Sequence, residues 1–379
     1  MPIPLDEFPV HQAPLSMAHP ATSDRNFYDR SYFNAHDRTG EVFIITGFGV
    51  YPNLGVIDAF VTVKHGDQQV TVRTSDALGD DRMSTAVGPY RIEVIEPLER
   101  LRVVCDAAEH GIELDMTWQG SFPAIDEPPH VIRRGNKVIL DAQRFAQVGT
   151  WEGRLVVDGT EFTIDPQQWV GTRDRSWGIR PVGESEPAGR PADDPGAQGF
   201  WWLYAPLRFD EFGIVVIVQE EPDGTRLLNE ARRVWPASSG RRPEELGWPE
   251  FDIRYRPGTR DPIGATIHMA DRRRRPVTIE VENLGNIALN SGTGYGGDPS
   301  WGHGQWRGEA WTERYVTDLT DPEVIARAAF TPVDHVARAT LTGSGMNGDS
   351  GEFVGYGLFE HATIGQHDPS GFADFTSVA

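Results

Sequence analysis

The chain has 379 residues, a formal net charge of −21 at pH 7 and 39% hydrophobic residues, which include 11 tryptophans and 18 phenylalanines. This length is about twice that of a usual domain, so we expect two domains or one large β assembly. The negative charge argues against nucleic acid or an anionic membrane surface as the main partner, and the aromatic content argues against a disordered chain.

The first residues and the cysteine content bear on the location of the protein. The chain start lacks the basic and continuous apolar regions of a signal peptide, and no segment approaches about 18 uninterrupted apolar residues. Cys105 is the only cysteine, and no Asn-x-Ser/Thr sequon occurs. We therefore expect a cytoplasmic protein without an integral membrane segment, in which Cys105 is a packing residue of a strand.

Two early segments, 32–37 and 48–53, mix aromatic and polar side chains. They contain His36 and Tyr51, which we expect to line the mouth of a first barrel. Residues 112–118 then alternate between apolar and polar side chains, which predicts a half-buried strand.

A hairpin and a charged aromatic segment follow. Asp158-Gly159 between two strand-like runs predicts a tight turn, and residues 169–180 place two Trp, three Arg and one Asp within twelve positions. One interpretation is a ligand site in which Arg173 and Arg175 tune the carboxylate of Asp174 beside the indole of Trp177. The other is a latch that closes a strand end or docks two domains. An adjacent arginine lowers the pKa of an aspartate, so this pairing favours an ionised Asp174 over a general acid.

A segment rich in Pro, Gly and charge, 183–198, predicts the boundary between two domains, 1–182 and 199–379. Gly149-Thr-Trp-Glu-Gly153 in the first half and Gly304-Gln-Trp-Arg-Gly308 in the second form a weak repeat, which supports two duplicated barrels.

The strand predicted after the boundary is the most aromatic part of the chain. Phe200, Trp202 and Tyr204 share one face of it. Such a face packs in a core, or it lines a pocket for a long apolar molecule.

The rest of the chain continues the strand pattern. Residues 222–224 predict a second hairpin, 251–255 and 277–281 alternate, and the arginine run 272–275 fits a solvated hairpin tip. The best helical segment is 321–329, with Asp321 as its N-cap. Short strands at intervals of about ten residues predict an antiparallel sandwich or barrel.

Motifs for metals, nucleotides and activated nucleophiles are absent, so we expect no metal and no cofactor. Residues 292–297 match Gly-x-Gly-x-x-Gly, but Asp298-Pro299 does not open a helix, so we expect a flexible loop that can act as a lid. The histidines show no ligand spacing, and only His36, His303 and His361 have neighbours that leave a role open.

The sequence Asp174-Arg175-Ser176-Trp177-Gly178, followed by an aromatic strand in an all-β chain of this length, resembles the AttH/carotenoid 1,2-hydratase-like group. The resemblance implies two tandem lipocalin-like antiparallel β-barrels. It also implies apolar isoprenoid or polyene substrates that are transformed without metal or nucleotide.

The chain departs from the pattern of these hydratases at two positions. Their motif reads Asp-His-x-Trp-Gly, and a Tyr-x-Asp on the next strand supplies the acid thought to protonate an alkene. Asp174, Trp177 and Gly178 match, whereas Arg175 replaces the histidine and Pro206 stands where the second aspartate would be. Both departures count against alkene hydration.

We therefore expect a protein that binds a hydrophobic small molecule of isoprenoid, steroid, polyketide or acyl type. If it is an enzyme, the expected chemistry is cofactor-independent hydration, dehydration, isomerisation or cyclisation, with Asp174 and Tyr204 as catalytic residues. The predicted substrate-binding residues are Arg173, Arg175, Trp177, Trp202, Tyr51 and His36. The alternatives are a non-catalytic carrier or sensor with the same pocket, and a structural or interaction protein. The sequence leaves the oligomeric state open.

Overall fold

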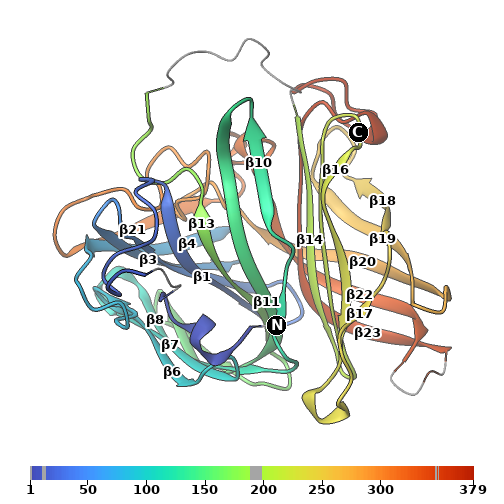
Figure 1. The fold of residues 1–379 in the computed structure, drawn as a ribbon, viewed down its shortest axis with the longest axis horizontal. Helices are drawn as coiled ribbons and strands as arrows, with labels where there is room; N and C mark the ends of the chain where they lie inside the picture. The colour runs from blue at the N-terminus through green and yellow to red at the C-terminus, as the bar shows by residue number, and fades with distance from the viewer. Residues whose placement is uncertain (1, 11–13, 188–198, 346–347, 349) are drawn as a thin grey trace.

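The computed structural model describes residues 2–10, 14–187, 199–345, 348 and 350–379. Within these residues the strands form two curled antiparallel sheets, of 14 and 9 strands, which stand side by side (Figure 1). This arrangement confirms the predicted all-β class with tandem lipocalin-like barrels.

The first sheet contains all strands of the first half and one strand of the second. Its order is β21-β4-β3-β2-β1-β13-β11-β8-β7-β6-β5, with β9, β10 and β12 also paired to β11. The bounds are β1 (Phe27–His36), β2 (Val42–Tyr51), β3 (Val56–His65), β4 (Gln68–Ala77), β5 (Ala86–Val87), β6 (Tyr90–Glu96), β7 (Arg100–Ala107), β8 (Ile112–Gly120), β9 (Ile125–Asp126), β10 (His130–Arg134), β11 (Lys137–Val157), β12 (Thr160–Ile164), β13 (Val170–Ile179) and β21 (Trp311–Asp318).

The second sheet has the order β17-β16-β15-β14-β23-β22-β20-β19-β18. Its strands are β14 (Gly199–Phe209), β15 (Gly213–Glu220), β16 (Arg226–Val234), β17 (Glu244–Glu245), β18 (Glu250–Tyr255), β19 (Pro262–Ala270), β20 (Pro276–Ile287), β22 (Val333–Ser344) and β23 (Ser350–Gly365). The helical elements are the short helix α1 (Pro322–Ala328) and the 3-10 turns η1 (Pro4–Glu7), η2 (Ala108–His110), η3 (Ala237–Ser239) and η4 (Asp368–Ser370).

The division of the chain at 183–198 stays a prediction, and most of that segment, 188–198, lies outside the described residues. One feature was not predicted: β21, from the second half of the sequence, pairs antiparallel with β4 and so extends the first sheet. The loop that leads to β21 therefore crosses from the second sheet back to the first.

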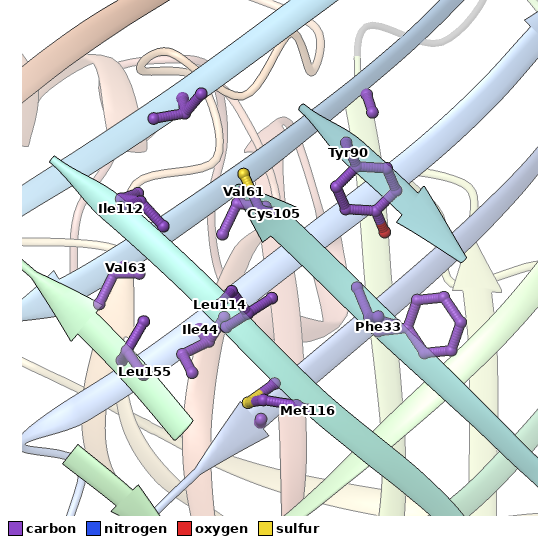
Figure 2. Packing of buried hydrophobic residues seen from close by; sticks show 14 of the residues in the cluster. Phe33, Ile44, Val61, Val63, Tyr90, Cys105, Ile112, Leu114, Met116 and Leu155 are labelled. Carbon is purple, nitrogen blue, oxygen red and sulfur yellow. The ribbon is translucent and has the colours of Figure 1, made fainter. Parts of the chain in front are cut away.

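The three largest hydrophobic clusters fill the two barrels and the space between the two sheets. One fills the interior of the first barrel, where Cys105 packs as predicted and is in register with Leu114 of the next strand (Figure 2). A second fills the interior of the other barrel. The third lies between the sheets and includes Tyr32, Trp202 and Tyr204, because β11 and β13 of the first sheet contact β14 and β23 of the second.

Several local predictions are confirmed. Asp158-Gly159 forms the turn between β11 and β12, and residues 222–224 form the turn between β15 and β16. Asp321 caps α1 by accepting a hydrogen bond from the Glu323 amide.

The predicted structural repeat of 149–153 and 304–308 is wrong, because Trp151 is fully buried in β11 whereas Trp306 is 48% exposed in the loop before β21. The two tryptophans have no equivalent place in the fold.

Candidate functional site

A cavity of about 390 Å³ lies between the two sheets. Its wall is built from both barrels, because β1, β11 and β13 contribute residues from one side and β14 and β23 from the other. The apolar part of the wall includes Ile132, Leu140, Phe200, Phe330, Pro332 and Leu358. The cavity has the size and the mixed lining of a small-molecule site.

Strand β13 divides the charged aromatic segment between two faces. Successive side chains of a strand point to opposite sides, so Asp174 and Ser176 line the cavity while Arg173 and Arg175 face the interior of the first barrel. Trp177 also faces away from the cavity and packs edge-on against Phe145, with ring centroids 6.5 Å apart. The predicted contact between Arg175 and Asp174 is therefore wrong.

The two arginines have acidic partners of their own. Arg173 forms a bidentate ion pair with Glu7, with N–O distances of 2.7 and 2.9 Å, and both side chains are almost fully buried. Arg175 pairs with Asp29 and donates to the Glu7 carbonyl oxygen. These contacts attach the N-terminal turn η1 to the first barrel, as a latch would, and they leave neither guanidinium facing the cavity.

The glycine that follows Trp177, Gly178, is required by the backbone geometry of β13. Its backbone has φ +133°, and an added Cβ would lie 2.0 Å from the Asp141 carbonyl oxygen on β11. Only glycine fits such a conformation and such a close approach. This part of the motif therefore serves the pairing of β13 with β11 and not the cavity.

Asp174 has the environment of an acid that holds its proton near neutral pH. Burial between the sheets raises its pKa to about 7, against the lowering effect of Arg144 and with a further rise from Glu127 and Glu360. No side chain among the described residues forms an ion pair or a hydrogen bond with its carboxyl group. The sequence predicted that Arg175 lowers the pKa of Asp174, whereas burial in the fold raises it.

This shift predicts a pH dependence of stability. Because the pKa is higher in the folded than in the unfolded chain, the folded state holds the Asp174 proton between about pH 4 and pH 7 while the unfolded chain releases it, so rising pH favours unfolding. We therefore expect the free energy of unfolding of Asp174→Asn to rise by about 2–4 kcal/mol relative to that of the wild type as the pH is raised from 4 to 8. Urea unfolding at each pH measures this difference. A variant less stable than the wild type at pH 8 would instead support an ion-paired Asp174.

A row of polar side chains crosses the second sheet opposite Asp174. Tyr204 on β14 is in register with Glu360 on β23, which is in register with Asp334 on β22. Burial and the neighbouring Glu360 raise the pKa of Asp334 well above its usual range, and Tyr32 from the first sheet donates to it at 2.6 Å. Pro206 stands where the Tyr-x-Asp pattern of the hydratases has its aspartate. In this chain Glu360 provides a carboxyl group beside Tyr204 instead.

Tyr204 keeps its proton at neutral pH. Burial raises the pKa of its hydroxyl well above 10, and Glu127 and Asp174 raise it further. Tyr204 is therefore a hydrogen-bond donor, not a base.

Trp202 lies beside Tyr204 in the cavity wall. Its indole N–H donates to Glu360, and the His130 ring stacks against it at 5.7 Å. The Arg144 guanidinium, which is ion-paired with Glu127 at 3.0 Å, lies over the indole at 5.7 Å. A protein cation therefore already lies over this ring, which limits its use for a cationic intermediate.

The glycine-rich loop between β20 and β21 forms part of the cavity wall. Tyr295 and Gly296 of this loop line the cavity, and His303 of the same loop is buried. The imidazole of His303 contacts both Arg30 and Arg180, two further arginines of the cavity wall. Arg30, Arg180, Arg144 and Glu360 are not among the site residues predicted from the sequence.

Two predicted ligand-binding residues lie outside the cavity wall. Tyr51 is fully buried and donates to Asp58 at 3.0 Å. His36 is fully buried edge-on against Phe43, and burial lowers its pKa to about 4. Both side chains therefore serve the packing of the first sheet, and neither lines the cavity.

The described parts of the chain offer neither a metal site nor a membrane-spanning helix. No group of three or more His, Cys, Asp or Glu side chains in these residues is arranged to hold a metal ion. No helix in the same residues is long and apolar enough to cross a membrane.

Comparison with solved structures supports the two-barrel fold. A kievitone hydratase from Nectria haematococca is similar with a TM-score of 0.50 and 14% identity, over 88% of each chain. A protein from Nitrosomonas europaea described as AttH has a TM-score of 0.47 and 14% identity over 88% of this chain and 92% of its own, and CghA has 0.49 and 12% over 89% and 88%. The match to the kievitone hydratase shows a shared fold, as the resemblance to the AttH/carotenoid 1,2-hydratase-like group predicts.

Comparison of the sequence itself gives a broader assignment. No curated protein matches the chain. One family model does, and it spans residues 3–373, which is nearly the whole length. The chain therefore belongs to this family, which is described as a family of unknown function, DUF8625.

Proposed function

We propose that the protein binds a hydrophobic small molecule in the cavity between the sheets and transforms it by cofactor-independent acid–base chemistry. The observation that carries this proposal is the Asp174 carboxyl group, which faces the cavity and has a pKa of about 7. A general acid or base works best when its pKa is close to the working pH. The reactions that fit are hydration, dehydration, isomerisation and cyclisation.

The geometry of the site supports a proposed role for each of three residues. Asp174 donates a proton to the bound molecule or removes one, and the Tyr204 hydroxyl donates a hydrogen bond to a developing negative charge. Glu360, held by Trp202, can accept a proton from water or from carbon on the side of the second sheet. The fold shared with a protein named kievitone hydratase supports the inclusion of hydration among these reactions.

Isotope incorporation tests the proposal with whatever compound the protein retains. Apolar compounds extracted from the purified protein would be identified by mass spectrometry and returned to the protein in H₂¹⁸O and, separately, in D₂O. Hydration places ¹⁸O in a new C–O bond, and protonation at carbon places deuterium in a C–H position. We expect incorporation with the wild type and with the exposed control Asp252→Asn, but not with Asp174→Asn. Unchanged compound from every protein would favour a carrier or sensor.

A further inference from the structure

Arg30 is a buried cation with unused hydrogen-bond donors. It lies on β1 in the cavity wall and is 4% exposed. One of its nitrogens, Nη1, contacts Nδ1 of His303, whereas Nε and Nη2 have no hydrogen-bond partner. It forms no ion pair with any residue that the structure describes. Asp58 and Asp174 stabilise this charge through space, but burial leaves the Nε and Nη2 donors without a hydrogen-bond acceptor, which is unfavourable.

Arg180 brings a second guanidinium to the same place. It follows β13, lines the cavity and lies over the ring of Tyr28 at 4.7 Å. Its Nη2 is 3.0 Å from the same His303 nitrogen that contacts Arg30. It too lacks an ion pair within the described part of the chain.

The imidazole of His303 positions both arginines without neutralising either. Because its Nδ1 accepts from two guanidinium groups, its proton is on Nε2, which donates to the Thr293 carbonyl oxygen at 2.8 Å. Burial and the two arginines lower the pKa of His303 well below its usual range, so the ring stays neutral. The ring also stacks on Phe60 with centroids 6.0 Å apart, which fixes its orientation.

Two carboxyl groups, those of Asp58 and Asp174, act on Arg30 through space, but neither forms an ion pair with it. Asp58 accepts hydrogen bonds from the Tyr51 hydroxyl and the Gly304 amide, at 3.0 and 2.7 Å. Burial raises the pKa of Asp174 to about 7, which weakens its charge at neutral pH. Arg144, in contrast, has its own carboxylate partner in Glu127. The cavity wall therefore presents two adjacent arginines whose charge is not matched by a direct protein partner.

We infer that the ligand of this cavity is a mostly apolar molecule that carries one ionised acidic group, and that Arg30 and Arg180 bind this group. A carboxylate, enolate or phenolate meets the requirement, because two guanidinium groups offer several donors to anionic oxygens. The inference rests on the proposed function only in placing the ligand in the same cavity. Within the hydrophobic small molecules of the proposed function, the inference selects those that carry an acidic group.

A pair of fluorescent ligands with and without an anionic group tests this inference. The anion 1-anilinonaphthalene-8-sulfonate and its uncharged analogue N-phenyl-1-naphthylamine share one aromatic skeleton. Arg30→Met is expected to weaken binding of the sulfonate by about tenfold or more, because hydrogen bonds to charged groups are involved, and to change binding of the uncharged analogue less than about twofold. Arg180→Met, at a half-buried position, is expected to act in the same way and serves as the second test should Arg30→Met not fold.

A second cavity supplies the control. It has a volume of about 480 Å³, lies beside α1, and includes Arg256 in its wall. Arg256→Met is expected to leave the affinity for both ligands unchanged. Sulfonate binding that is lost in Arg256→Met but kept in Arg30→Met and Arg180→Met would overturn the inference. The outcome is independent of turnover, so loss of the sulfonate preference and absence of isotope incorporation can be told apart.

Discussion

Asp174→Asn is expected to lower the turnover number for the cavity ligand by about 100- to 10,000-fold, which is the usual contribution of one general acid or base. Asparagine has nearly the same shape as a protonated aspartate but cannot donate or accept a proton at this pKa. Binding should persist, because Asp174 forms no ion pair or hydrogen bond within the described chain that the change would break. The measurement is single-turnover kinetics with the compound recovered from the protein.

Tyr204→Phe separates the two proposed catalytic residues. It removes a hydrogen-bond donor and leaves the acid in place, so we expect a smaller loss, of about ten- to a hundredfold in turnover. Unfolding by urea should show that both variants are folded. Turnover by Asp174→Asn within about threefold of the wild type would contradict the role given to Asp174.

Arg173→Met is expected to lower the free energy of unfolding by about 3–5 kcal/mol, as is usual when one partner of a buried ion pair is removed. The Arg173 side chain is 0% exposed and that of Glu7 is 3% exposed, so the carboxylate would remain buried without its bidentate partner. Burial alone would raise the pKa of Glu7, but Arg173 and Arg175 outweigh it and hold this pKa below its usual value. Urea unfolding at pH 7 measures the loss.

Two further variants define the origin of this loss. Glu7→Gln combined with Arg173→Met removes both charges and should be more stable than Arg173→Met alone. Arg100→Met breaks the exposed ion pair with Glu152 and should cost less than about 1 kcal/mol. If Arg173→Met behaved like Arg100→Met, the N-terminal turn would not be held by this pair.

The fold was largely predictable because its signals are local. Alternation over 112–118 and 277–281 and the turn residues Asp158-Gly159 each specify one strand or one turn without reference to the rest of the chain. The pairing of β21 with β4 was not predictable in this way, since it joins residues about 240 positions apart and leaves no local pattern.

The site was predicted in part. Asp174, Tyr204 and Trp202 do line one cavity, but the charge of Asp174 was inferred from its sequence neighbour Arg175. In a strand such neighbours lie on opposite faces, so the relevant groups come from other strands. For the same reason Arg173 and Trp177 turn away from the cavity.

The missed residues come from segments that only the strand register brings together. Arg30, Arg144, Arg180 and Glu360 lie in four separate parts of the sequence and form no motif. A weaker signal did exist: Glu360 lies beside Leu358 and Phe359 in a run that reads as buried, and a charged residue at such a place is seldom there for packing.

The protonation state of Asp174 is the quantity on which the proposed chemistry depends most directly. A carbon-13 NMR titration of the aspartate side-chain carboxyl groups, assigned by comparison with Asp174→Asn, would measure it in the folded wild type. We predict one aspartate signal, absent from the variant, that titrates with a midpoint of about 7. A midpoint near the usual aspartate value of about 4 would show an ionised Asp174 at neutral pH and would contradict its role as an acid.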